Sequence, residues 1–162
     1  MTGSCAEFSN EQKRLVRASF AEAERIADIF GLIFYRRLFE VDPRLRPLFR
    51  NNIEEQSKKL MATLRMAVDG LDQQRGLVSS IQALGRRHVQ YGVKDEYYDT
   101  VGQTLLWAFE QALGPRFNPQ AREAWRAVYN WLATTMKEAA AEVRESFDTT
   151  RFTAPETKAS AP

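Results

Sequence analysis

The only histidine of the chain, His88, is the residue whose chemistry is best suited to a metal. It follows Leu77, Ile81 and Leu84 at successive intervals of four, three and four residues. This spacing places the imidazole at the end of an apolar stripe on one face of a helix, directed toward the interior. Two interpretations are open: a core histidine that donates one nitrogen to a backbone carbonyl, or a neutral imidazole that ligates a metal.

The number of other ligands in the sequence limits the kind of metal site. A zinc site built by the protein needs three or four histidine, cysteine or carboxylate ligands. This chain has one histidine and one cysteine, Cys5, which lies near the N-terminus. A metal that brings its own equatorial ligands needs only one ligand from the protein, and haem is such a group. Haem is therefore the metal alternative for His88.

The elements that would position this histidine are helical, because apolar residues recur at helical spacing and no long stretch alternates with period two. An apolar face continues from Val16 to Phe39. Further helices are expected from about 53 to just before 70, from after 76 to 92, from a cap at Asp95 to Gly114-Pro115, and from 119 onward. Local signals for helix starts are Ser9 with Gln12, Asp42-Pro43 and Asn118-Pro119. The fold class is all-α, with six to eight helices.

Length and composition describe one globular domain. The chain has 162 residues, of which 44% are hydrophobic and 11% aromatic, enough for a packed core. From Asp148 the sequence changes to TTRFTAPETKASAP, a composition typical of disorder. We therefore expect a flexible N-terminus over residues 1–8, a helical domain over 9–147 and a disordered C-terminal tail over 148–162.

Charge and cysteine content exclude several functional classes. The chain has 23 Lys and Arg against 21 Asp and Glu, so a net charge of +2 predicts neither nucleic acid nor an acidic membrane as a partner. Cys5 has no mate for a disulfide, which favours a reducing compartment. No apolar run has membrane-spanning length, and the first residues do not have the pattern of a signal peptide. We expect a soluble, cytoplasmic protein.

Three segments together resemble the globin family, and among its members the bacterial single-domain haemoglobins related to the haem-binding half of flavohaemoglobins. The segments are FYRRLFEVDPRLRPLF (34–49), EEQSKKLM (54–61) and LGRRHVQYGV (84–93). Tyr35 precedes Pro43 by eight residues, Pro43 precedes Phe49 by six, and Gln56 precedes His88 by thirty-two. The resemblance covers about residues 9–140, and it implies a globin fold whose helices enclose a haem b pocket.

The resemblance assigns four residues to the iron and the porphyrin. It implies that His88 is the iron ligand, that Leu84 lines the proximal face and that Phe49 packs flat on the porphyrin. Val93, five residues after His88, matches a common haem contact. For Phe49 and Val93, ordinary core packing is the alternative.

The resemblance also assigns Tyr35, Gln56 and Leu60 to the open side of the iron. A phenol O–H and an amide N–H directed at bound O₂, which carries partial negative charge, would each contribute about 1–3 kcal/mol. Leu60, one turn after Gln56, would restrict the pocket above the iron. For Tyr35 the alternative is a core tyrosine whose hydroxyl bonds to the backbone. For Gln56 the alternative is an exposed glutamine in the first turns of a helix.

The remaining candidates surround this core of the site. Because the chain has one histidine, bis-histidine coordination within the chain is excluded, and the sixth position is open, water-filled or held by a weaker ligand such as Tyr35. Lys59 and Arg87 could pair with the haem propionates. Tyr98 matches a tyrosine that in flavohaemoglobins assists a glutamate bonded to the proximal histidine, but that glutamate position is Ala140 here. The stretch between Phe49 and Gln56 also leaves little room for a separate helix.

Several functions are compatible with this sequence. The first is tight, reversible binding of O₂, with NO and CO as further gaseous ligands. The second is a nitric oxide dioxygenase, which would need a separate reductase because the chain has no Gly-rich dinucleotide motif. The third is a gas sensor, and the fourth is a helical interaction module without haem.

Overall fold

A computed structural model describes residues 7–153, and all regular elements in that range are helical. Six α-helices and three short 3₁₀ segments follow one another along the described chain: α1 (Asn10–Arg25), α2 (Ala27–Val41), η1 (Pro43–Leu48), α3 (Ile53–Asp69), η2 (Leu71–Gln73), α4 (Gln74–Gln90), α5 (Asp95–Leu113), η3 (Gly114–Arg116) and α6 (Pro119–Thr153). This confirms the prediction of an all-α fold with six to eight helices. Within residues 7–153, none of the helices combines the length and the apolar composition of a membrane span.

The predicted helix starts are formed by the expected side chains. Ser9 and Gln12 make both bonds of a capping box, each side chain accepting from the other residue's backbone N–H. The side chain of Asp42 accepts from the N–H of Arg44 at 3.1 Å at the start of η1, and Asn118 likewise caps α6. These ends were predictable because capping depends on residues only two or three positions apart.

Other helix ends differ from the prediction. Asp95 is the first residue of α5 and not its cap; Lys94 precedes it without a capping hydrogen bond. Its carboxylate instead pairs with Arg144 at 2.8 Å, and an acidic residue in the first turn of a helix is itself favourable. Helix α4 begins at Gln74, before Gly76, because η2 leads directly into it. As expected, no helix separates Phe49 from α3.

The apolar face expected from Val16 to Phe39 is divided between two helices. Helix α1 ends at Arg25, and the N–H of its C-cap, Ile26, donates to the carbonyl of Ala23 at 3.1 Å. Helix α2 begins at the next residue, Ala27. Neither a glycine nor a proline marks this break, so the sequence gives no local signal for it.

Both predicted domain boundaries require correction. Phe8, expected in the flexible N-terminus, is buried: its ring packs edge-on against Trp131 at 5.8 Å, and its N–H donates to Gln74 Oε1 at 3.2 Å. The predicted tail starting at Asp148 begins inside a helix, because α6 continues to Thr153. Cys5 and the rest of the predicted tail lie outside the described residues.

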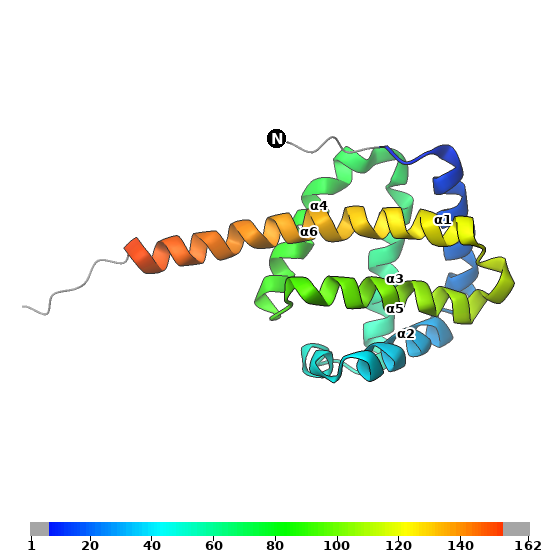
Figure 1. Ribbon diagram of the computed structural model, residues 1–162, viewed down its shortest axis with the longest axis horizontal. Helices are drawn as coiled ribbons and strands as arrows, with labels where there is room; N and C mark the ends of the chain where they lie inside the picture. The colour runs from blue at the N-terminus through cyan, green and yellow to red at the C-terminus, as the bar shows by residue number, and fades with distance from the viewer. Residues whose placement is uncertain (1–6, 154–162) are drawn as a thin grey trace, which may run out of the picture.

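The packing of the helices leaves α3 and α4 apart. Helix α4 packs mainly on α6 and α3 mainly on α2, while α3 and α4 make little contact with each other. Two glycines permit the close approaches: a Cβ on Gly31 would lie 2.0 Å from Ser57 Oγ, and one on Gly85 would lie 2.5 Å from the carbonyl oxygen of Met136. Figure 1 shows α6 alongside α5 and extending well beyond the rest of the helical body.

The core lies where α1, α2, α5 and α6 meet. Phe109 packs against Phe30 at 4.8 Å and against Trp125 at 4.6 Å between ring centroids. The indole N–H of Trp125 donates to Ser19 Oγ at 2.7 Å, so the largest buried side chain has its polar atom satisfied. This rigid core supports the two separated helices, α3 and α4.

Candidate functional site

His88 lies in the last turn of α4 and is half-buried. Its Nδ1 is 2.8 Å from the carbonyl oxygen of Leu84. A carbonyl can only accept, so Nδ1 carries the proton, and Nε2 of the neutral ring has an unshared electron pair. Within residues 7–153 Nε2 has no hydrogen-bond partner. Burial lowers the pKa of His88; the bond to Leu84 opposes this shift, and the positive charge of Arg87 adds to it.

The residues around His88 form a compact proximal group. Helix α4 ends with Gly92 at a positive φ of 84°, and the N–H of Val93 then donates back to the carbonyl of His88 at 3.0 Å. The ring of Tyr98, on α5, stacks on the imidazole at 6.3 Å with an angle of 28°. Leu84 and Val93 are half-buried against the core. The structure therefore brings Leu84, His88, Val93 and Tyr98 together.

The hydrogen bond of His88 to a backbone carbonyl agrees with the lack of a glutamate in the sequence. Ala140, which the resemblance places at the position of the flavohaemoglobin glutamate, is 1% exposed. No carboxylate among the described residues bonds the imidazole. Its acceptor is a neutral carbonyl, which gives the ring less anionic character than a carboxylate partner would.

Tyr35 lies on α2 and is buried, with 3% of its surface exposed. Its hydroxyl donates to the backbone carbonyl of Gln56 at 3.2 Å, which is the bond expected of a core tyrosine. Burial raises the pKa of the hydroxyl, so it remains a neutral donor. The ring contacts Phe49 edge-on at 5.3 Å, and Phe39 packs on both rings. Tyr35, Phe49 and Gln56 thus form a second group, at the start of α3.

The side chains of α3 complete this distal group. Gln56 and Leu60 are half-buried one turn apart, and Leu60 packs against the core. In the described part of the chain, the side-chain amide of Gln56 has no hydrogen-bond partner, while its backbone N–H donates to the carbonyl of Asn52. Lys59 and Arg87 are exposed, and neither is ion-paired within residues 7–153. No hydrogen bond, ion pair or ring contact between described residues joins the distal group to the proximal one.

A cavity of about 380 Å³ opens between α3 and α4. Its lining includes Leu84 and Arg87 from the predicted set, and the other lining residues are Ala62, Thr63, Met66, Ser80 and Ala83. A larger cavity of about 620 Å³ lies between α2, α5 and α6, and none of the predicted site residues lines it. His88 lines neither cavity, and the smaller one adjoins the helix that carries it.

These residues fit a haem group better than a metal held by the protein alone. Residues 7–153 contain no cluster of three or more histidine, cysteine or acidic side chains that could hold an ion. They do contain a neutral imidazole with an unpartnered Nε2, two helices held apart, and apolar side chains left half-buried on both. A flat apolar group with its own metal would be held by His88 and would cover these apolar side chains.

Sequence reasoning missed several residues that surround the proximal group. Tyr91 contacts the imidazole at 6.1 Å between ring centroids, and the hydroxyl of Tyr129 donates to the carbonyl of Tyr98. Lys137 lies over the ring of Tyr98, and Arg144 bonds the carbonyl of Val93. Tyr129, Lys137 and Arg144 lie on α6, far along the chain from His88. For Lys137 and Arg144, the only signal in the sequence was their regular spacing with Ala140 on one face of that helix.

Comparisons with known proteins agree with this geometry. The globin family model matches residues 32–136. Neuroglobin of Danio rerio is 28% identical in an alignment of length 144 that covers 80% of this chain and 91% of that protein.

Two solved structures are similar to this chain. One is an engineered carbene transferase, a variant of a candidate nitric oxide dioxygenase from Rhodothermus marinus, with a TM-score of 0.77 and 28% identity over 87% of this chain and 99% of that one. The other is a bacterial globin from Campylobacter jejuni, with a TM-score of 0.73 and 25% identity over 85% of this chain and 99% of that one. The chain therefore belongs to the globin family, and its cofactor is haem.

Proposed function

We propose that this globin binds O₂ reversibly and tightly at haem b, with His88 as the iron ligand. The observation that carries the proposal is the bond from Nδ1 of His88 to the Leu84 carbonyl, which leaves Nε2 free to ligate. The lowered pKa of His88 supports it, because the imidazole is then neutral at pH 7. When bound, haem iron supplies the open coordination position at which a diatomic gas binds.

Apolar and charged side chains share the work of holding the cofactor. Phe49, Leu60, Leu84 and Val93 are half-buried, and a porphyrin between α3 and α4 would remove their remaining apolar surface from water at about 25 cal/mol per Å². We assign the propionates to Lys59 and Arg87, each of which would contribute only about 0–1 kcal/mol as an exposed pair. Apolar burial is thus the main contribution to haem retention beyond the His88 bond.

Tyr35 and Gln56 are assigned to the gas. Tyr35 is a neutral phenol and Gln56 an unpartnered amide, and the two meet where α2 crosses the start of α3. Both are hydrogen-bond donors. Among O₂, NO and CO, the ligand that draws the most negative charge, O₂, gains the most from them.

Absorption spectra of the purified protein in its ferric, ferrous and CO-bound forms test the cofactor assignment. We expect an intense band at about 400 nm that shifts with each form, as is typical of haem proteins. His88→Ala should lose the band or its ligand-dependent shifts, while the exposed control Gln90→Ala should keep both. A His88→Ala protein with unchanged spectra in all three forms contradicts the assignment.

A second function, nitric oxide dioxygenase, is favoured by one specific observation, the similarity to the candidate dioxygenase from Rhodothermus marinus. In that reaction O₂ and NO combine to nitrate, and a separate reductase returns the one electron consumed per turnover. Nitrate formed in large excess over protein when a flavin reductase and NADH are added would support the enzyme. Nitrate that stops at one equivalent under the same conditions would support binding alone.

A further inference from the structure

The corner between α4 and α5, residues 91–94, is built directly onto the residue that carries the imidazole. Gly92 turns the chain with a positive φ of 84°, a conformation that favours glycine. The N–H of Val93 then donates to the carbonyl of His88 at 3.0 Å. Because His88 stands in the last turn of α4, whatever fixes this corner also fixes the backbone from which the imidazole extends.

One side chain from a distant part of the chain holds this corner from outside. Arg144, on α6, donates through Nη1 to Asp95 Oδ1 at 2.8 Å and through Nη2 to the carbonyl oxygen of Val93 at 3.1 Å. The two acceptors lie on opposite sides of Lys94. A guanidinium can bond both because its planar fork presents several N–H groups in a fixed geometry, whereas an ammonium is a single point.

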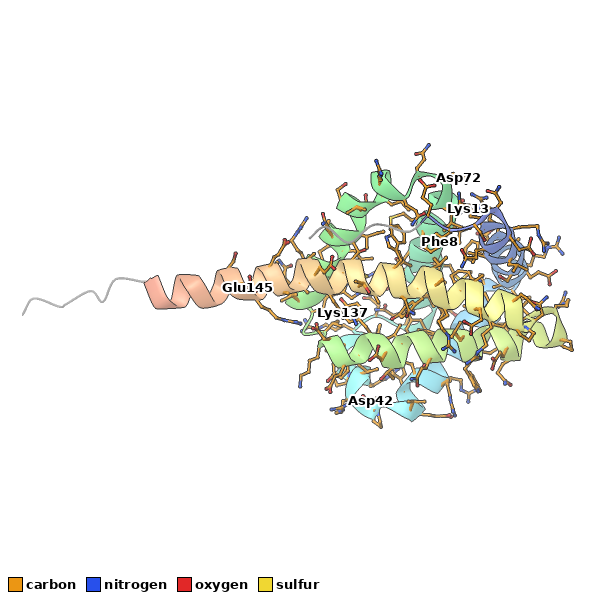
Figure 2. The ribbon with its side chains drawn as sticks, turned by 45° about the horizontal axis from the view of Figure 1, so that its top comes forward. Phe8, Lys13, Asp42, Asp72, Lys137 and Glu145 are labelled. Carbon is orange, nitrogen blue, oxygen red and sulfur yellow. The ribbon has the colours of Figure 1, made fainter. Side chains whose placement is uncertain are left out.

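Helix α6 also supports the ring that stacks on the imidazole. Lys137 Nζ lies 6.0 Å from the centroid of Tyr98, and the Tyr98 ring lies 6.3 Å from that of His88. Lys137 and Arg144 are seven residues apart, which is two helical turns, so they share one face of α6. Figure 2 labels Lys137 on this stretch and Glu145 immediately after it, where α6 begins to extend beyond the other helices.

We propose that Arg144 is a positioning residue that clamps the α4–α5 corner and thereby fixes the orientation of the His88 imidazole toward the iron. Its ion pair with Asp95 is partly exposed, at 39% and 55% of the two side chains, and so contributes little to stability by itself. Its effect comes from geometry, because the same guanidinium holds the Val93 carbonyl. This inference rests on the proposed ligation of haem by His88.

The test compares Arg144→Met with Arg126→Met, which removes another arginine of α6 whose ion pair, to Glu123 at 3.5 Å, lies away from the corner. The first measurement is hydrogen exchange of the Val93 amide in the protein as purified. The second is the iron–imidazole stretching band of the ferrous protein in resonance Raman spectra. In Arg144→Met we expect exchange at least about tenfold faster, because the corner opens locally, together with a shifted and broadened band. Arg126→Met should leave both unchanged.

Arg144→Lys provides a second variant with intermediate behaviour, because lysine keeps the charge and can satisfy only one of the two acceptors. Unchanged Val93 exchange in Arg144→Met would show that there is no clamp. Faster exchange with an unchanged Raman band would reduce the clamp to a purely structural contact and overturn the positioning role. A wild-type protein without a haem band would refute the proposed function instead, and the exchange measurement would still report on the clamp.

Discussion

Replacement of Tyr35 by phenylalanine separates the two roles that the buried hydroxyl can have. In the structure the hydroxyl donates to the carbonyl of Gln56 at 3.2 Å. A phenol has one proton to donate, so this bond must be given up when the hydroxyl turns to a gas in the pocket. The effect of Tyr35→Phe on gas release is therefore the difference between two hydrogen bonds.

The magnitude follows from the kinds of acceptor. A hydrogen bond to a neutral carbonyl contributes about 0.5–1.5 kcal/mol, and one to a charged acceptor contributes about 1.5–3 kcal/mol. The difference, about 1–1.5 kcal/mol, corresponds to O₂ dissociation that is about five- to twelvefold faster in Tyr35→Phe. Loss of the Gln56 bond lowers the free energy of unfolding of the gas-free protein by only about 0.5–1.5 kcal/mol, because the carbonyl remains inside α3, where the next turn supplies a donor.

Stopped-flow displacement of O₂ by CO measures the dissociation rate, and urea unfolding measures stability. Thr104→Val is a matched control, because Thr104 is also buried and donates its hydroxyl to a backbone carbonyl, that of Thr100, at 2.7 Å. It should lower stability to a similar extent and leave O₂ release unchanged. If Tyr35→Phe loses stability in the same way but releases O₂ within twofold of the wild-type rate, Tyr35 is a packing residue and the distal assignment is wrong.

Two further predictions concern the framework that carries the site. Asp72 forms ion pairs with Lys13 at 3.0 Å and with Arg17 at 2.8 Å, and hydrogen bonds from these two cations lower the pKa of its carboxyl. Figure 2 labels Asp72 and Lys13. These two ion pairs therefore stabilise the fold fully above about pH 4 and progressively less as the pH falls and Asp72 becomes protonated. Asp72→Asn should lower the urea midpoint at pH 7 and leave it unchanged at pH 2. Equal midpoints of the variant and the wild type at pH 7 would contradict this prediction. Gly85→Ala should cost about 1–3 kcal/mol in urea unfolding, because its Cβ would lie 2.5 Å from the carbonyl of Met136. Gly76→Ala in the same helix, with no atom nearer than 3.9 Å to its Cβ, should be neutral or stabilising, and equal losses in both would exclude the close approach as the cause.

The sequence was informative about the fold wherever structure depends on close neighbours. The caps at Ser9, Asp42 and Asn118 form as predicted, because each bond joins residues two or three positions apart. The break at Ile26 was missed, since neither a glycine nor a proline marks the end of α1 there. Asp95 was misassigned as a cap because its partner, Arg144, lies 49 residues away.

For the candidate site, the spacing of residues along each helix predicted which side chains share a helix face. It did not predict the hydrogen-bond partner of each side chain. The proximal group around His88 and the distal group around Tyr35 assemble as separate clusters on α4 and α2–α3. A backbone acceptor for the Tyr35 hydroxyl was one of the alternatives, but no residue pattern identifies it as the carbonyl of Gln56. Lys137 and Arg144 escaped notice because they reach the site only through the length and direction of α6.

The reactions that this globin can support depend on which group accepts the hydrogen bond from Nδ1 of His88. A carboxylate acceptor would push electron density through the ring toward the iron and favour cleavage of the O–O bond. Here the acceptor is the neutral carbonyl of Leu84, the glutamate position is the buried Ala140, and Lys137 places a positive charge over the neighbouring Tyr98 ring. All three features reduce the anionic character of His88. Together with the hydrogen-bond donors that we propose on the opposite side, this combination would favour holding O₂ intact over breaking it. That is the requirement shared by the two functions proposed above, a reversible carrier and a dioxygenase that delivers both oxygen atoms to NO.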